Sequence, residues 1–129
     1  MLHRILVVED DQDIRETLVE VLTDLGFAVA SAADGLEALA QLREPEDAWC
    51  MVLLDLMMPH MDGREFRVEQ LRDPALARIP VVIVSAVADV TTVANELGVD
   101  AHVTKPVTVT KLVEAVERYC PRSRRLQPA

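Results

Sequence analysis

The sequence predicts an open, doubly wound α/β sheet, and two observations lead to that prediction. Three short, unbroken apolar runs rich in β-branched residues, at positions 5–8, 51–54 and 81–84, are typical of strands covered on both faces. Helical patterns alternate with strand patterns five times along the chain, and this order forces parallel pairing through right-handed crossovers. We therefore expect five strand–helix units in one sheet with helices on both of its faces.

The first helix follows strand 5–8 and is marked by apolar residues that share one helical face. These residues are Ile14, Leu18, Val21, Leu22 and Leu25. Their spacing is that of a helix with one side in the core. Gly26 is expected to end this helix, and residues 27–31 are a weaker strand candidate.

The second and third helices begin with the same capping pattern, an Asp followed three residues later by a Glu. Asp34 and Glu37 predict a helix that runs to about Leu42. Asp62 and Glu65 predict another helix of the same kind.

The last two helices lie on either side of a second weaker strand candidate, Ala101–Thr104. Asp89 is expected to cap the first of these helices and Gly98 to end it. Thr108 begins the second helix. Its inward-facing residues are expected to be Leu112, Val116 and Tyr119.

The length and composition fit one domain with an aliphatic core. The chain has 129 residues, of which 50% are apolar and 3% aromatic, and this composition excludes a disordered chain. Residues 1–120 are expected to form the domain, and residues 121–129 a polar, Arg-rich tail or linker. The sequence leaves open whether this is a single-domain protein or the amino-terminal part of a longer one.

The charge balance argues against nucleic acid and membrane partners. Acidic residues outnumber basic ones by 22 to 13, and the net charge of −9 repels nucleic acid phosphates and anionic membrane surfaces. The longest uncharged stretch, residues 79–88, is too short to span a bilayer. The first apolar run meets Glu9 too early for a secretory signal. We expect a cytoplasmic protein with no membrane insertion and no direct contact with nucleic acid.

Two cysteines, Cys50 and Cys120, lack the spacing of a metal site. In a cytoplasmic protein, such residues are usually small buried hydrophobic side chains rather than a disulfide. We therefore expect the two cysteines to be unlinked and assign neither a role.

Polar side chains follow the predicted strands at the edge where such sheets bind ligands. They are Glu9, Asp10 and Asp11 after the first strand, Asp55 after the third, Ser85 after the fourth, and Thr104, Lys105 and Pro106 after the fifth. Because the carboxyl ends of parallel strands lie together, we expect these residues to converge.

Three of these carboxylates, Glu9, Asp10 and Asp55, predict a cation site, because like charges brought close together penalise their own ionisation. Oxygen donors without His or Cys favour Mg²⁺ over zinc. The alternative is a set of unrelated helix caps, and either Asp11 or Asp13 is suited to cap the first helix.

Several short motifs at these strand ends resemble the receiver domains of two-component response regulators. They are ILVVEDD at 5–11, LLDLMMP at 53–59 with Asp62-Gly63, IVSA at 83–86 and TKP at 104–106. The resemblance covers residues 3 to about 120 and implies a flavodoxin-like sheet of order 2-1-3-4-5. It also implies phosphoryl transfer to Asp55 from a histidine kinase or a histidine phosphotransfer protein.

Carried over by position, the resemblance implies a set of metal ligands. Asp10 and Asp55 would bind Mg²⁺ directly, together with the backbone carbonyl of Met57, and Glu9 would act largely through bound water. These roles suit a transfer reaction that needs charge neutralisation and alignment more than acid–base help.

The resemblance also implies phosphoryl ligands and a switch. Ser85 and Lys105 would each bind a phosphoryl oxygen, and the Lys105–Pro106 bond would be cis. His102 occupies the position of the family's aromatic switch residue, so the switch would involve Ser85 and His102. The output would be a changed surface on the helix after Asp89, strand Ala101–Thr104 and the last helix, which would bind a downstream protein, an effector domain or a second copy.

Departures from the family pattern concern the switch and the lifetime of the phosphoryl group. A histidine stands where the family usually has an aromatic switch residue, and Val107 follows the Lys-Pro pair where the family often has Phe. Met57 and Val87 are apolar where the family often varies its hydrolysis rate with polar side chains.

Two other functions remain as alternatives to a phosphoacceptor that is not a turnover enzyme. The first is a Mg²⁺-dependent phosphohydrolase with Asp55 as nucleophile, similar to haloacid dehalogenases. That family places a second Asp two residues after the nucleophile, where this chain has Met57, which cannot transfer a proton. The second is an interaction module that keeps the fold without being phosphorylated.

Overall fold

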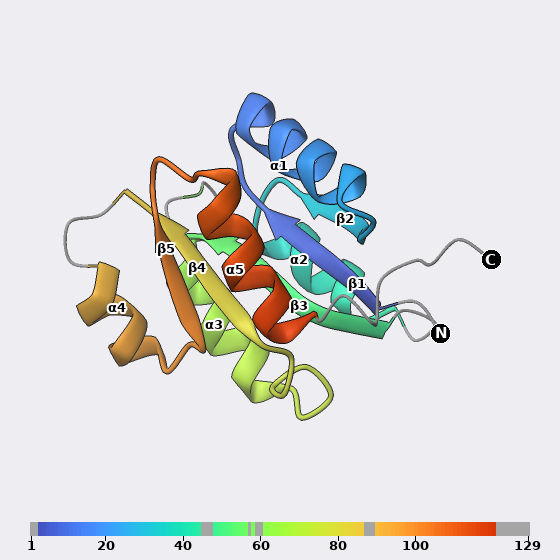
Figure 1. The fold of residues 1–129 in the computed structure, drawn as a ribbon. Helices are drawn as coiled ribbons and strands as arrows, with labels where there is room; N and C mark the ends of the chain where they lie inside the picture. The colour runs from blue at the N-terminus through green and yellow to red at the C-terminus, as the bar shows by residue number, and fades with distance from the viewer. Residues whose placement is uncertain (1–2, 45–47, 57, 59–60, 87–89, 121–129) are drawn as a thin grey trace.

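A computed structural model describes residues 3–44, 48–56, 58, 61–86 and 90–120, and it has the predicted alternation of strands and helices (Figure 1). The elements are β1 (His3–Val8), α1 (Gln12–Asp24), β2 (Ala28–Ala32), α2 (Gly35–Leu42), β3 (Ala48–Asp55), α3 (Gly63–Arg72), β4 (Val81–Ser85), α4 (Val90–Leu97), β5 (Ala101–Thr104) and α5 (Val109–Tyr119). All strand pairs are parallel and the strand order is β2-β1-β3-β4-β5. The predicted fold class and strand order are therefore confirmed.

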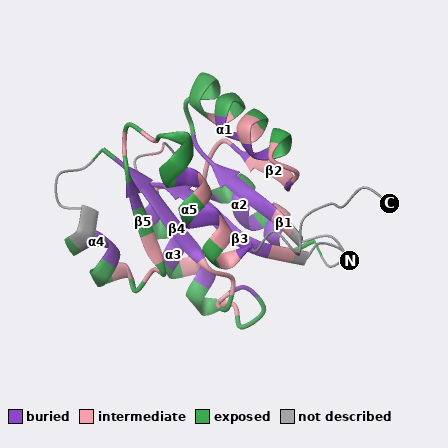
Figure 2. Ribbon diagram, in the orientation of Figure 1, coloured by how far each residue is buried: buried purple, intermediate pink, exposed green. Residues whose placement is uncertain are grey.

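The core consists of two apolar layers, one on each face of the sheet. Successive residues of β1 point to opposite faces: Ile5 packs with α1 and α5, and Leu6 packs with α2 and α3. Figure 2 shows the inner strands as buried and the outer helix faces as exposed. In the described part of the chain, no helix is both long and apolar enough to cross a membrane.

Four helices begin at the polar caps that the sequence indicates. The side chains of Asp11, Asp34, Asp62 and Thr108 each accept a hydrogen bond from the backbone N–H three residues further on. Of the two candidates for the first helix, Asp11 is the cap. Each such bond stabilises its helix by about 1 kcal/mol. The predicted cap of α4, Asp89, lies outside the described residues.

One residue of α1 differs from the sequence-based expectation. Leu18 and Leu22 are buried as predicted, but Ile14 is 37% exposed. Ile14 lies in the first turn of α1, which follows the carboxyl end of β1 after a short connection. Its side chain instead borders the cavity that also contains Asp55 and Lys105.

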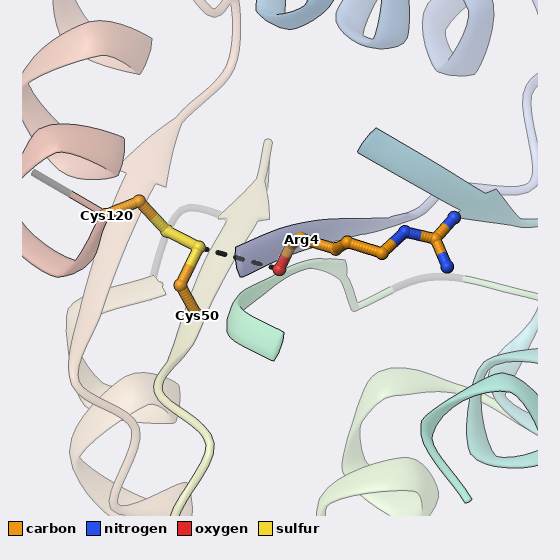
Figure 3. Close-up of a disulfide and its surroundings, with 3 residues drawn as sticks. All are labelled: Arg4, Cys50 and Cys120. Atoms are coloured by element: carbon orange, nitrogen blue, oxygen red, sulfur yellow. Dashed lines mark hydrogen bonds between the residues drawn. A yellow bond between two sulfur atoms is a disulfide. The ribbon is translucent and has the colours of Figure 1, made fainter. Parts of the chain in front are cut away.

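The expectation that the cysteines are unlinked is wrong. Cys50 and Cys120 form a disulfide whose Cα atoms are 5.6 Å apart, although the two residues are separated by 70 positions in the chain (Figure 3). The register of β1 against β3 shifts between Arg4 and Ile5, which leaves Cys50 as an extra residue on β3. This bulge turns Cys50 and the next residue, Met51, toward the same core as Cys120. Sequence spacing carries no information about this contact, because the tertiary fold creates it.

Candidate functional site

Six of the eight residues predicted to converge line one cavity at the carboxyl edge of the sheet, whereas Thr104 and Pro106 line two separate cavities. Asp55 and Ser85 are the last residues of β3 and β4, Glu9 directly follows β1, and Lys105 directly follows β5. A cavity of about 470 Å³ opens there. Its lining residues are Glu9, Asp10, Asp11, Ile14, Asp55, Ser85, Ala86 and Lys105.

Three carboxylates form a compact acidic cluster in this cavity. Glu9 and Asp55 are 2% and 5% exposed, and Asp10 is exposed to solvent. One oxygen from each of the three lies within 4.8 Å of the others, close enough to bind a single metal ion. Two buried carboxylates and one exposed carboxylate form a hard, all-oxygen donor set that is open on one side, which fits Mg²⁺ with water completing its coordination.

Lys105 is the cation that balances this cluster within the described residues. Its Nζ lies 3.1 Å from Glu9 Oε1 and 3.7 Å from Asp55 Oδ1. Burial opposes the charge of Lys105, but the hydrogen bond to Glu9 and the charges of Asp55, Glu9 and Asp10 outweigh it and raise the pKa of the ammonium. Lys105 therefore stays protonated at neutral pH.

Even with Lys105 present, repulsion among the three carboxylates disfavours their ionised forms. Burial and the neighbouring Asp55 raise the pKa of Glu9, although Lys105 and the Asp11 N–H, which donates to Glu9 Oε2 at 3.2 Å, act in the opposite direction. Partial desolvation and the adjacent Glu9 also raise the pKa of Asp10. One ammonium group does not compensate three carboxylates, so the site favours a further cation.

Two residues without a predicted role, Arg15 and Gly63, also shape this site. The guanidinium of Arg15 donates to the backbone carbonyl of Glu9 at 2.8 Å and to that of Asp10 at 3.4 Å, and so holds the turn between β1 and α1. A side chain at Gly63 would place its Cβ 2.9 Å from the Cα of Leu56 and 3.0 Å from the carbonyl oxygen of Asp55. The Asp62-Gly63 motif marks Gly63 in the sequence, whereas Arg15 has no local sequence signal because its partners lie on the preceding turn.

The phosphoryl-binding candidates also lie at the cavity. Ser85 is 1% exposed, and its carbonyl oxygen accepts a hydrogen bond of 3.0 Å from the backbone N–H of Lys105. This bond ties the end of β4 to the residue after β5. The Lys105–Pro106 peptide bond is cis, as the resemblance implied. Met57 and Val87 lie outside the described residues. The predicted metal ligand at the Met57 carbonyl and the predicted effect of both side chains on phosphoryl lifetime therefore stay predictions.

His102 does not join this site. It lies on β5, paired with Ile83, and its side chain is exposed. It borders a separate cavity between β5 and α5, beside Lys111 and Arg118. Val107 lines a third, mostly apolar cavity with Ile14 on α1.

Comparisons with known proteins agree with this geometry. The family model of the response regulator receiver domain matches residues 5–117. Response regulator RR06 of Streptococcus pneumoniae is 37% identical over 117 residues, which are 88% of this chain and 51% of that protein. The chain spans about half the length of the first curated relatives that it matches.

Solved structures show the same fold. The chemotaxis protein CheY4 of Vibrio cholerae matches with a TM-score of 0.82 and 25% identity, covering 92% of this chain and 99% of that one. The phosphorylated cyanobacterial phytochrome response regulator RcpA matches with a TM-score of 0.79 and 30% identity, covering 94% and 96% of the two chains.

Proposed function

The chain belongs to the family of response regulator receiver domains, and from that premise we propose that it accepts a phosphoryl group on the carboxylate of Asp55 in a Mg²⁺-dependent reaction. The observation that carries this proposal is the position of Asp55. Its carboxylate ends a buried strand, lines the cavity, and lies close to the other two carboxylates and 3.7 Å from the ammonium group of Lys105.

Glu9, Asp10 and Asp55 are the residues that would hold the metal ion, together with the carbonyl of Met57 that the resemblance implies. When bound, Mg²⁺ supplies the charge neutralisation that lets an anionic carboxylate approach an anionic phosphoryl group. Asp10 is exposed at the mouth of the cavity, whereas Glu9 and Asp55 are buried behind it. This arrangement leaves room for water and phosphoryl oxygens on the open side.

The transfer itself forms one bond and breaks one. A carboxylate oxygen of Asp55 attacks the phosphorus, and the bond from phosphorus to the donor nitrogen of a phosphohistidine breaks, with the electron pair leaving on that nitrogen. Lys105 and the hydroxyl of Ser85 would stabilise charge on the phosphoryl oxygens, and both residues line the cavity of Asp55. A base is not needed, because the attacking group is already a carboxylate.

The family takes phosphoryl groups from histidine kinases and acts on downstream effectors, and we assign this chain the same kinds of partner. The donor would be a histidine kinase or a histidine phosphotransfer protein that reaches the cavity of Asp55. The output surface would consist of α4, β5 and α5, which carry His102, and would bind a downstream protein, an effector domain or a second copy. Ser85 would connect the phosphoryl group with this surface, because its carbonyl oxygen accepts a hydrogen bond from the backbone N–H of Lys105, the residue after β5.

The proposal is tested by intact mass measurement after treatment with acetyl phosphate and Mg²⁺. The unmodified chain is expected to gain one phosphoryl group, and Asp55→Asn is expected to gain none. Asp11→Asn is the matched control: it neutralises a carboxylate beside the same cavity but keeps a good helix cap, so it should still be labelled. Labelling of Asp55→Asn at the level of the unmodified chain would overturn the assignment.

A further inference from the structure

The disulfide lies at the end of the sheet opposite the acidic cluster. Cys50 is near the start of β3, and Asp55 is the last residue of the same strand. Five residues of extended chain separate them, a distance of about 16 Å. Cys120 directly follows the last residue of α5. The cross-link therefore joins the amino end of a central strand to the carboxyl end of the last helix, and it has no part in the Asp55 site.

The bulge in β3 is what brings the two sulfur atoms together. In a regular strand, Cys50 and Met51 would point to opposite faces of the sheet. With the bulge, both face the core that contains α5. Bulges of this kind redirect single side chains. Cys50 is 6% exposed and Cys120 is 2% exposed, so both cysteines are packed in the core.

The surroundings of Cys50 also suit the reduced form. Its Sγ lies 3.5 Å from the backbone carbonyl oxygen of Arg4, the contact drawn in Figure 3. A disulfide sulfur has no proton to donate, but a thiol at the same place would donate to this oxygen. Both redox forms of Cys50 therefore fit the same pocket, and the buried thiol of reduced Cys50 has the Arg4 carbonyl oxygen as its acceptor.

From this geometry we propose that Cys50 and Cys120 form a reversible redox site, a thiol–disulfide cross-link that fixes the end of α5 in the oxidised form and releases it in the reduced form. The reductant is a dithiol. It supplies two electrons and two protons, the sulfur–sulfur bond breaks to give two thiols, and the dithiol closes to its own disulfide.

The contacts of α5 limit what reduction can change. Leu112, Ala115 and Val116 are buried and hold the helix in the core by apolar packing. Beyond them, the end of α5 is held by the Cys120 N–H bond to the Val116 carbonyl at 2.7 Å and by the Tyr119 hydroxyl, which donates to the Asp100 carbonyl at 3.1 Å. Reduction is expected to loosen this last turn alone, since helix ends open more easily than buried segments.

The test uses the full chain and mixtures of reduced and oxidised dithiothreitol in buffer without denaturant. After acid quenching and alkylation with N-ethylmaleimide, mass spectrometry is expected to show a reversible change between no label and two labels. Trp49, the one tryptophan of the chain, is next to Cys50. Its fluorescence is expected to change when the disulfide is reduced and to return when it is formed again. Cys50→Ala and Cys120→Ala are the controls and should show no change of Trp49 emission.

Hydrogen exchange then measures the effect on the helix. Amides at the end of α5 are expected to exchange at least tenfold faster in the reduced form, while those of β1 and β3 keep their rates. Three results would overturn the proposal: thiols that stay unlinked in excess oxidised dithiothreitol, a disulfide that is reduced only when the protein unfolds, or equal exchange at the end of α5 in both forms. Phosphoryl labelling of Asp55 is measured separately and has no bearing on these outcomes.

Discussion

We expect the stabilising effect of Mg²⁺ on the folded state to depend strongly on the carboxylate of Asp10. It is the exposed member of the acidic cluster, and its negative charge adds to the repulsion between the two buried carboxylates. A ligand that binds only the folded state stabilises it. The rise in melting temperature on adding Mg²⁺ therefore tests whether Asp10 contributes to metal binding.

We predict that Mg²⁺ at ten times its dissociation constant stabilises the unmodified chain by about 1.4 kcal/mol. This corresponds to a rise of a few degrees in melting temperature for a domain of this size. In Asp10→Asn the rise should be smaller at the same Mg²⁺ concentration, and the metal-free protein should be no less stable than the unmodified chain.

Glu16→Gln is the control for the Asp10 substitution, since it removes an exposed carboxylate that lies outside the acidic cluster. Its response to Mg²⁺ should equal that of the unmodified chain. An equal response in Asp10→Asn would show that the metal binds elsewhere.

At the scale of elements, the contact between α3 and the end of α4 depends on a buried cation. Arg67 is 7% exposed and donates to the carbonyl oxygens of Leu97 at 3.0 Å and Gly98 at 2.7 Å, and to Gln70 Oε1 at 2.8 Å. Burial lowers the pKa of this guanidinium, and the charge of Asp100 partly opposes that effect. Gln70 in turn donates to the carbonyl of Ile79 at 3.0 Å, which extends the network to the loop before β4.

Replacing Arg67 with Met should reduce the free energy of unfolding by about 3 kcal/mol, because two carbonyl oxygens at the end of α4 lose buried donors. Urea denaturation measures this change.

The matched control for Arg67 is Arg64→Met on the same helix. Arg64 is exposed and forms an ion pair of 3.6 Å with Glu96 of α4, and removing it should change stability by less than about 0.5 kcal/mol. Equal effects of the two substitutions would show that the buried network does not hold α4.

At the scale of the whole molecule, the acidic cluster links global stability to pH. Its carboxylates come from the ends of β1 and β3, so their repulsion acts on the folded chain and disappears when it unfolds. Glu9 has a pKa above its ordinary value of 4.5 in the folded state. The folded state therefore binds this proton more tightly than the unfolded state, and stability falls as pH rises above about 4.5 toward the higher folded-state value.

We predict that, without Mg²⁺, Glu9→Gln becomes progressively more stable relative to the unmodified chain as pH rises from 4 to 7. At pH 4 Glu9 is mostly protonated in both states, so the advantage should be smallest at that end of the range. Urea titrations across this range measure the difference.

Glu20→Gln, which removes an exposed carboxylate of α1, is the control for this pH dependence and should leave it unchanged. Parallel stability curves for Glu9→Gln and the unmodified chain would contradict the prediction.

Local sequence determined most of the fold and the positions of the site residues. Unbroken apolar runs at 5–8, 51–54 and 81–84 lie within β1, β3 and β4, because strands buried on both faces need no polar alternation. The caps of α1, α2, α3 and α5 are short-range hydrogen bonds and can be identified from neighbouring residues. Since parallel strands end at one edge, the order of elements also brought Glu9, Asp55, Ser85 and Lys105 together.

The tertiary structure alone decided three other features. Arginine side chains are mostly exposed in proteins, but Arg67 is buried and donates to the Leu97 carbonyl at the end of α4. Ile14 has the spacing of a core residue, but it borders the cavity because it lies in the first turn of α1, next to the carboxyl end of β1. Cys50 and Cys120 pair because a bulge between β1 and β3 turns one sulfur toward the end of α5. Each feature depends on contacts between residues far apart in the chain, and local patterns contain no information about such contacts.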